Sequence, residues 1–296
     1  MNRNDAKKAM RWTMGLLGWL GLSVSYAAQP MPELSAETLK KIEEALPAKA
    51  TAKPKKPRKL LVCWRCEGFF HGGGIAAGTK AIALMGQKTG AYATEVSADY
   101  AAFDAANLAQ YDAVVLNNTT RLALPDDAKK QALLDFVKGG KGLIGIHSAT
   151  DNFYDAPAAA QMIGGTFNGH PWGGGGTWAF KNEEPDHVLN RAFAGKGFKL
   201  KDEVYQFKAP YSREQQRVLL ALDLSDPVTA EPAKGGARAD QDYAVAWIKK
   251  FGSGRVFYCA LGHDANVFQE PAILQFYLDG IQYALGDLKA DATPKK

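Results

Sequence analysis

Short apolar runs alternate with helical patterns in the first half of this chain, and this alternation constrains the fold more than any other feature. Each run is long enough for a strand and too short for a helix. The runs are continuously apolar rather than alternating, which indicates a parallel sheet covered by helices on both faces. The strand-like runs lie at residues 59–64, 92–97, 111–116 and 142–146, and the helical patterns lie at 79–87 and 125–138.

The second half of the chain changes character and is richer in extended segments. Two of them are separated only by residues 250–254 (KFGSG), which predicts a hairpin. Residues 225–241 combine proline, glycine and charge and indicate a loop, whereas 271–285 predict a closing helix that ends at Gly286. We therefore expect one α/β domain with an elaborated C-terminal half and a frayed tail at 287–296. The extended segments lie at 177–181, 203–207, 218–222, 244–249 and 255–260.

The first 27 residues have the pattern of a secretory signal peptide. Four basic residues precede an uncharged apolar run at 12–25, and Ser25 and Ala27 supply the small residues of a cleavage site. The alternative is a membrane anchor, but the run is shorter than the roughly 20 residues that span a bilayer. We expect an exported, periplasmic protein with no membrane contact after cleavage.

A short helix and a basic stretch precede the predicted sheet. Residues 35–46 form an amphipathic pattern with Ser35 as N-cap, and 49–59 carry six basic residues and no acid. The basic stretch indicates either a tether for anions or, more simply, a solvated linker. Without the leader the chain is close to neutral, so its charge gives no argument for nucleic acid as a partner.

The three cysteines are too few for a disulfide-stapled scaffold. Cys63 and Cys66 form a C-x-x-C, but residues three apart on a strand point to opposite faces. We expect all three to be reduced and structural, with Cys66 near the site.

Polar residues gather directly after the predicted strands, where open α/β sheets bind their ligands. Four of the five histidines lie in such positions or in glycine-rich turns. Each of these residues also has a structural interpretation: asparagine and threonine cap turns, and Glu67 and Glu203 could pair with Arg65 or Arg121. The candidates are Glu67, His71, Asn117, Asn118, Thr119, His147, Asp151, His170, Trp172, Glu203, Tyr205, His263 and Asp264.

Two glycine-rich segments invite a more specific interpretation. Residues 72–77 (GGGIAA) satisfy the dinucleotide signature formally, but they do not follow their strand directly, which argues against nucleotide binding. Residues 172–178 (WGGGGTW) place Trp172 in a flexible aromatic loop. This tryptophan either contacts a sugar or packs in the core.

Several of these motifs, taken in order, resemble the ThuA-like (trehalose utilisation) family. The resemblance covers about 59–286 and implies a flavodoxin-like, class I glutamine amidotransferase-like fold: a parallel sheet with helices on both faces. The matching segments are 59–71 (KLLVCWRCEGFFH), 117–120 (NNTT), 145–151 (GIHSATD), 164–171 (GGTFNGHP), 202–206 (DEVYQ), 246–247 (AW) and 254–264 (GRVFYCALGHD).

The resemblance also shows what is absent. Where a glutamine amidotransferase has its nucleophilic cysteine, this chain has His147, and Ser148 is one residue away from that position. Glutamine hydrolysis through a thioester is therefore not expected. The family is associated with trehalose and with 3-keto sugars made by partner oxidoreductases, which implies a small carbohydrate as the substrate.

A 3-keto glycoside could be cleaved by acid–base chemistry, because its carbonyl acidifies the neighbouring C2 proton. Among the catalytic candidates Glu67, His147, Asp151, His170 and His263, we expect His147 or Glu67 as base and His170 or His263 as acid or oxyanion donor. Asp151 or Asp264 could orient a histidine. The residues expected to contact the sugar are His71, Asn117, Asn118, Thr119, Trp172, Glu203, Tyr205 and Asp264. Two alternatives stay open. The same histidines and carboxylates could hold a divalent metal assembled from distant loops, or the chain could be a non-catalytic sugar-binding module.

Overall fold

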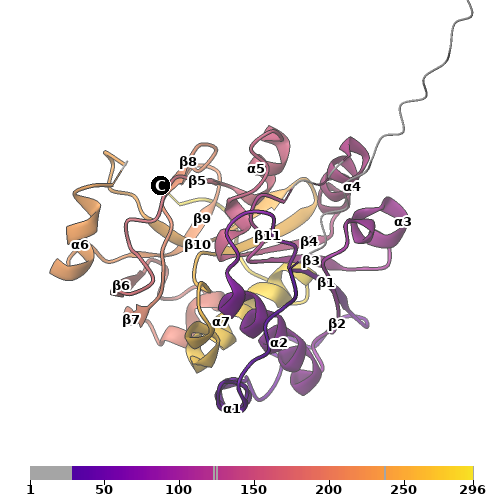
Figure 1. Cartoon of the computed structure of the whole chain (residues 1–296), viewed down its shortest axis with the longest axis horizontal. Helices are drawn as coiled ribbons and strands as arrows, with labels where there is room; N and C mark the ends of the chain where they lie inside the picture. Colours follow the sequence, from indigo (N-terminus) through magenta and orange to yellow (C-terminus); the bar gives the residue numbers. More distant parts are fainter. Residues whose placement is uncertain (1–28, 123, 125, 237, 296) are drawn as a thin grey trace, which may run out of the picture.

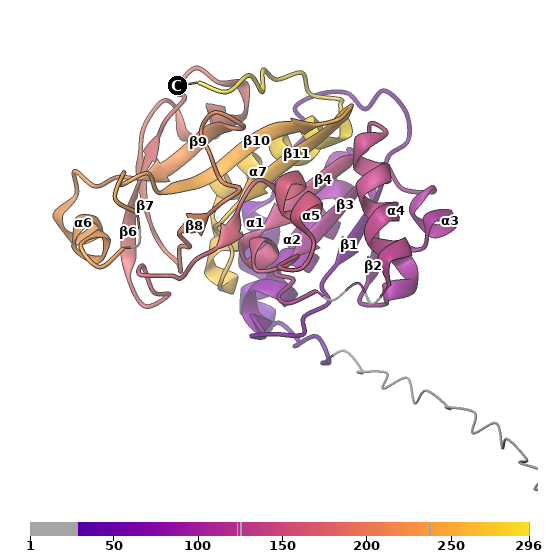
Figure 2. The same ribbon diagram turned by 90° about the horizontal axis from the view of Figure 1, so that it is seen from above.

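A computed structural model describes residues 29–122, 124, 126–236 and 238–295, so the predicted signal peptide lies outside the described residues. Figures 1 and 2 show a central twisted sheet flanked by helices. Over the described part of the chain, nine strands form this sheet in the order β2-β1-β3-β4-β11-β10-β9-β6-β7, and β5 pairs separately with β8. None of the described helices is long and apolar enough to cross a bilayer.

The sheet has a parallel half, as the sequence predicted, and an antiparallel half that the extended segments of the C-terminal half of the chain form. β2, β1, β3, β4 and β11 are parallel neighbours in the order of a flavodoxin-like sheet. The predicted hairpin joins β10 to β11, with Phe251 opposite Gly254. The strands are β1 (Lys59–Cys63), β2 (Ala93–Ser97), β3 (Ala113–Asn117), β4 (Gly142–Ile146), β5 (Thr166–Phe167), β6 (Thr177–Asn182), β7 (Phe198–Lys201), β8 (Phe207–Lys208), β9 (Arg217–Leu222), β10 (Ala244–Phe251) and β11 (Gly254–Cys259).

Helices cover both faces of the parallel half. α1, α2 and α7 lie on one face, and α3, α4 and α5 lie on the other (Figures 1 and 2). The α-helices are α1 (Ala36–Ala45), α2 (Gly72–Thr89), α3 (Ala105–Leu108), α4 (Asp127–Lys138), α5 (Pro157–Ile163), α6 (Pro227–Ala233) and α7 (Pro271–Leu285). The 3-10 helices are η1 (Tyr100–Phe103), η2 (His147–Thr150), η3 (Val188–Phe193) and η4 (Ala265–Gln269).

The helix ends follow the predicted chemistry in several places. The Ser35 hydroxyl accepts from the Thr38 backbone N–H, and the Asp126 carboxylate accepts from the Lys129 backbone N–H. Gly90 and Gly286 end α2 and α7 in the left-handed conformation that favours glycine.

Three predicted elements differ from the structure. α2 begins at Gly72 rather than near residue 79, because its glycine turn packs under the loop after β11: a Cβ on Gly74 would lie 2.2 Å from the Gly262 carbonyl oxygen. The predicted strand at 203–207 is reduced to an isolated bridge at Val204 and the start of β8. Part of the predicted loop at 225–241 forms α6, with Asp226 as its N-cap.

The basic stretch at 49–59 is not a solvated linker. The Arg58 guanidinium bonds the Asp287 carboxylate at 2.6 Å and lies 3.5 Å from that of Asp112, and these three side chains are at most 10% exposed. The Gln282 side chain accepts from the backbone N–H groups of Thr51 and Ala52 at 2.9 and 3.0 Å. The stretch is thereby fixed along α7, since Gln282 belongs to that helix and Asp287 follows it.

The tail that we expected to fray also packs against the protein over its described residues. Arg217 pairs with the carboxylates of Asp291 and Glu184. The Lys295 ammonium reaches Glu184 at 2.7 Å. The lysine-rich composition suggested solvation, but Lys295 pairs with the buried Glu184 and Asp291 pairs with Arg217.

Replacing Arg58 tests whether its ion pair with Asp287 fixes residues 49–59 to the end of α7. Arg58→Ala leaves the buried Asp287 carboxylate without its cation, which should lower the free energy of unfolding by about 3 kcal/mol. Asp112 keeps the Lys56 ammonium at 2.7 Å. Urea denaturation measures this loss. Lys41→Ala, which breaks an exposed pair with Glu37 on α1, is the control and should cost less than about 0.5 kcal/mol. Equal stability of the two variants would show that the Arg58–Asp287 ion pair does not stabilise the fold.

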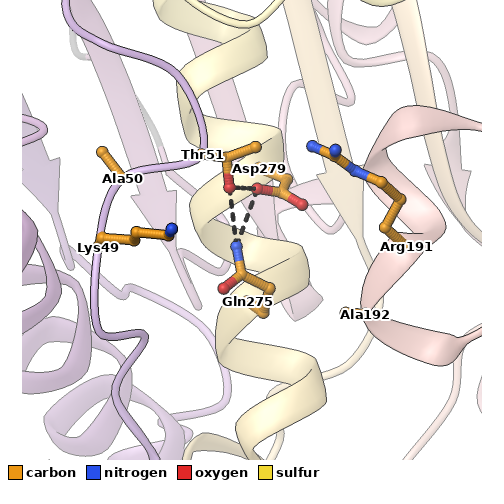
Figure 3. Close-up of a pocket in the computed structure, with 7 residues that line it drawn as sticks. All are labelled: Lys49, Ala50, Thr51, Arg191, Ala192, Gln275 and Asp279. Atoms are coloured by element: carbon orange, nitrogen blue, oxygen red, sulfur yellow. Dashed lines mark hydrogen bonds between the residues drawn. The ribbon is translucent and has the colours of Figure 1, made fainter.

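A second contact of the same stretch involves a buried acid. Thr51, Gln275 and Asp279 are joined by hydrogen bonds beside α7 (Figure 3). These residues line a pocket with a volume of about 480 Å³. Burial raises the pKa of Asp279 to about 6. An acid with a higher pKa in the folded state stabilises the fold at low pH, and this contribution is lost as the pH rises from about 4 to about 6.

Asp279→Asn keeps an acceptor oxygen and removes the titration. The stability of the variant minus that of the wild type should therefore rise by about 2 kcal/mol between pH 4 and pH 7. Urea denaturation at the two pH values gives this difference. A difference that stays constant with pH would show that Asp279 does not titrate in this range.

Candidate functional site

His147 occupies a strained position at the end of β4. Its φ of 49° lies in the left-handed region, which costs a non-glycine residue of the order of 1–3 kcal/mol. The side chain is fully buried, and its Nδ1–H donates to the Ala260 carbonyl oxygen at 2.7 Å. Gly145 permits the tight turn, since a Cβ there would lie 2.9 Å from the Tyr258 ring. We call this strained turn after β4 the elbow. It carries an imidazole at the position that the family resemblance assigned to the nucleophile of an amidotransferase.

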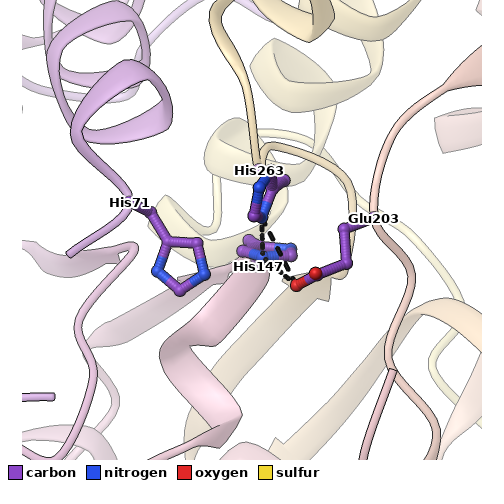
Figure 4. Close-up of side chains that lie close together, drawn as sticks. All are labelled: His71, His147, Glu203 and His263. Atoms are coloured by element: carbon purple, nitrogen blue, oxygen red, sulfur yellow. Dashed lines mark hydrogen bonds and ion pairs between the residues drawn. The ribbon is translucent and has the colours of Figure 1, made fainter. Parts of the chain in front are cut away.

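Glu203 and His263 reach the same point from two different loops. Glu203 follows β7 and His263 follows β11. The His147 Nε2 lies 3.2 Å from the His263 Nδ1 and 3.5 Å from the Glu203 Oε1, and the last two atoms are 3.3 Å apart. Figure 4 shows this compact arrangement. Three side chains that are distant in sequence therefore share one contact point at the carboxyl edge of the sheet.

Asp202 holds the two loops in this position. Its buried carboxylate accepts from the backbone N–H groups of Gly262 at 2.8 Å and His263 at 3.1 Å. Burial raises the pKa of Asp202 to about 8, although these two bonds act in the opposite direction. The residue next to Glu203 thus fixes the backbone of the loop that presents His263.

His71 completes the cluster from the start of α2 (Figure 4). Its ring lies edge-on to those of His147 and His263, with centroids 4.8 and 5.0 Å away. Its nitrogens lie 3.4 Å each from the hydroxyls of Ser148 and Tyr205. One ligand atom from each of His71, His147, Glu203 and His263 lies within 4.8 Å of the others, so this set could hold a metal ion.

Two residues stand at the mouth of the cluster. The His170 Nδ1 lies 3.3 Å from the Glu203 Oε2, and its side chain is 53% exposed. Phe69 is 69% exposed and stacks over His263 at a centroid distance of 6.4 Å. An exposed imidazole and an exposed aromatic ring therefore border a buried polar site.

The charges of the cluster are set by burial and by Glu203. Burial opposes ionisation of Glu203, but His147 and His263 outweigh it and hold the pKa of Glu203 below its ordinary value. Burial lowers the pKa of His147, and burial with the charges of His147 and His263 lowers that of His71 to about 2. For His263, burial is outweighed by Glu203, which raises its pKa. These shifts favour the charged forms of Glu203 and His263 and the neutral forms of His147 and His71.

Other sequence candidates lie outside the cluster. The Glu67 carboxylate pairs with Arg65 at 2.8 Å, which was its structural interpretation. Asp151 lies 3.5 Å from the Arg121 guanidinium and accepts from the Tyr154 hydroxyl, so it orients no histidine. Asp264 is exposed and precedes η4.

The candidates expected to contact a sugar after β3 are buried and bonded within the protein. Asn117 donates to the Ile75 carbonyl oxygen, Asn118 donates to that of Gly262, and Thr119 accepts from Asn152. Trp172 was a candidate for sugar stacking, and this was wrong. Its ring is fully buried against Tyr243, which leaves no face for a ligand.

Sequence reasoning missed Asp202 and the supports of the elbow. Asp202 precedes Glu203 within the DEVYQ segment, but only the fold shows that its partners are backbone groups about 60 residues away. The Tyr258 hydroxyl donates to the His147 carbonyl oxygen at 2.6 Å. All three cysteines are free and buried, as predicted.

The fold and the site define a class: a flavodoxin-like α/β protein with a histidine in place of the nucleophile at its elbow. The ThuA family model, described as trehalose utilisation, matches residues 59–284, and the chain belongs to this family. No curated protein matches the chain.

Solved structures resemble this chain at low sequence identity. A putative ThuA-like protein from Bacteroides uniformis is 18% identical with a TM-score of 0.65, covering 78% of this chain and 93% of its own. One from Parabacteroides merdae is also 18% identical, with a TM-score of 0.56 and coverages of 80% and 93%. A cytoplasmic protein from Salmonella typhimurium is 14% identical, with a TM-score of 0.51 and coverages of 77% and 99%. At these identities the likeness shows the fold alone.

Removing the Asp202 carboxylate should loosen the site. Asp202→Ala leaves two buried N–H groups without acceptors and should lower the free energy of unfolding by about 2 kcal/mol. Urea denaturation measures this. Asp264→Ala, an exposed aspartate beside the same loop, should change stability by less than about 0.5 kcal/mol. Equal effects of the two substitutions would contradict the role of Asp202.

Proposed function

We propose that this chain is an enzyme of carbohydrate catabolism that converts an oxidised disaccharide or glycoside. The family description, trehalose utilisation, supports the substrate class. The observation that carries the proposal is the cluster of His147, Glu203 and His263 at the carboxyl edge of the sheet, with His170 exposed beside it. Buried titratable groups that perturb one another in this way are typical of catalytic sites.

The reaction that fits these groups is elimination from a 3-keto glycoside. The ketone acidifies the C2–H bond, so a base removes that proton and the electron pair forms an enolate. The electrons then form the C1–C2 double bond as the C1–O bond breaks. The departing oxygen takes up a proton, and the products are an unsaturated keto sugar and a free alcohol or sugar.

The exposure and contacts of the residues favour different roles from those expected from sequence. His147 is fully buried and donates its Nδ1–H to a backbone carbonyl, which suits a fixed group rather than a proton shuttle. His170 is exposed, and a Nδ1–H bond to Glu203 would leave its Nε2 free as the base. The cationic His263 beside Glu203 would stabilise the developing enolate oxygen.

The proposal includes a cellular setting. A sugar oxidoreductase must supply the keto group, because these residues provide acid–base rather than redox chemistry. The N-terminal pattern supports export, so both proteins would act in the periplasm.

Mass spectrometry of the products tests the proposal directly. The purified protein is incubated with trehalose and with 3-keto-trehalose. Cleavage of the keto sugar alone is the expected result. Thermal stabilisation by either sugar without any product would instead support a non-catalytic binding module.

His170→Asn should separate catalysis from binding. Asparagine keeps a donor to Glu203 but cannot accept the proton, so kcat for the keto sugar should fall by roughly 10²–10⁴-fold with little change in KM. The matched control is His187→Asn, since His187 bonds the Asp291 carbonyl oxygen outside the cluster. Unchanged kcat in His170→Asn would exclude His170 as the base.

A further inference from the structure

We propose that His71, His147, Glu203 and His263 bind one divalent transition-metal ion, of which zinc is the simplest example. The binding of the ion stands on geometry alone. Its role in turnover rests on the proposed function. Three imidazoles and one carboxylate are ligands that suit zinc and its neighbours rather than magnesium or calcium.

The spacing of the ligand atoms favours a shared ion over hydrogen bonds. The three atoms His147 Nε2, His263 Nδ1 and Glu203 Oε1 form a nearly equilateral triangle with sides of 3.2, 3.3 and 3.5 Å. Ligands about 2.0–2.2 Å from a tetrahedral zinc lie about 3.3–3.6 Å from one another. Good hydrogen bonds between charged groups are shorter, at about 2.7–2.9 Å.

The hydrogen bonds around the cluster orient the ligand atoms inward. Because the His147 Nδ1–H is given to the Ala260 carbonyl oxygen at 2.7 Å, the lone pair of its Nε2 faces the other two ligands. The second oxygen of Glu203 is held by His170 at 3.3 Å, and Asp202 fixes the backbone of His263. Such supporting partners are usual around metal ligands.

His71 is the fourth ligand. Its nitrogen and the other three atoms lie within 4.8 Å of one another, so a small rotation of the ring brings it into range (Figure 4). Its present contacts, at 3.4 Å to two hydroxyls, are long and hold the ring weakly. An ion would replace one of these long contacts with a stronger bond.

With the ion bound, His263 would be a neutral ligand, and the ion would supply in its place the positive charge that the proposed reaction needs. Bound beside His170 and Tyr205, it would polarise the carbonyl oxygen of a keto sugar. The chain's own residues would then hold the ion and move the proton, with His170 outside the ligand set.

Titration of the protein with zinc tests the site without reference to activity. The full chain is purified without a histidine tag, treated with EDTA, dialysed and titrated by calorimetry with zinc chloride. We expect one ion per chain with a dissociation constant below about 1 µM, as for sites with several imidazole ligands. In a parallel sample, cobalt(II) should give the visible absorption of a four-coordinate site.

Variants locate the ion. Glu203→Gln and His263→Ala should each weaken zinc binding by at least about 10–100-fold and change the cobalt spectrum. His187→Asn should leave both unchanged, and circular dichroism shows whether each variant is folded. Absence of stoichiometric binding to the folded wild type would overturn the metal site, as would wild-type affinity in Glu203→Gln and His263→Ala.

The two proposals fail in different ways. Stoichiometric zinc binding without turnover of the keto sugar would leave the metal site standing and overturn the proposed function. Turnover by metal-free protein, unchanged when zinc is added, would support the proposed function and overturn the ion's role in it.

Discussion

A single buried carboxylate, that of Asp202, joins the two halves of the site. The parallel half of the sheet presents His147 and His263 at the ends of adjacent strands, β4 and β11. Glu203 comes from the antiparallel half, where sheet pairing does not align it with those strand ends. The bonds from Asp202 to the backbone of Gly262 and His263 make this alignment, at the cost of burying an acid. The two bonds compensate part of this cost, and burial remains the larger effect on the pKa of Asp202.

The elbow at His147 shows how the fold concentrates strain where chemistry is expected. A left-handed backbone at a bulky residue is unfavourable, so the surroundings must hold it in place. The Tyr258 hydroxyl in β11 donates to the His147 carbonyl oxygen. The Ala260 carbonyl oxygen, one residue after β11, accepts from the His147 ring. The same turn that would expose a nucleophile in an amidotransferase here directs an imidazole into a buried cluster.

The sequence predicted the parts of the molecule that depend on local patterns. The apolar strands, the closing helix and the histidines at strand ends follow from periodicity and from the rule that parallel strands share a carboxyl edge. The sequence did not predict the features that depend on contacts between residues distant in the chain. The glycines that open α2 give no helical signal, yet they let the helix pack under the loop after β11. Trp172 lies in a glycine-rich segment, yet its ring is fully buried against Tyr243. The basic stretch at 49–59 and the tail at 287–296 were expected to be solvated because their charged partners lie elsewhere in the chain.

The cluster is difficult to explain as a stabilising feature. Three imidazoles surround one carboxylate, and the hydroxyl contacts of His71 are too long to offset its burial. Apolar side chains of similar volume would fill the same space with less desolvation. A fold that retains such a group, holds it with a strained elbow and a buried acid, and leaves one further imidazole open to solvent has been shaped for something other than stability. The solved structures at 18% identity share the fold. A shared fold does not determine the chemistry, which depends on the side chains of the site.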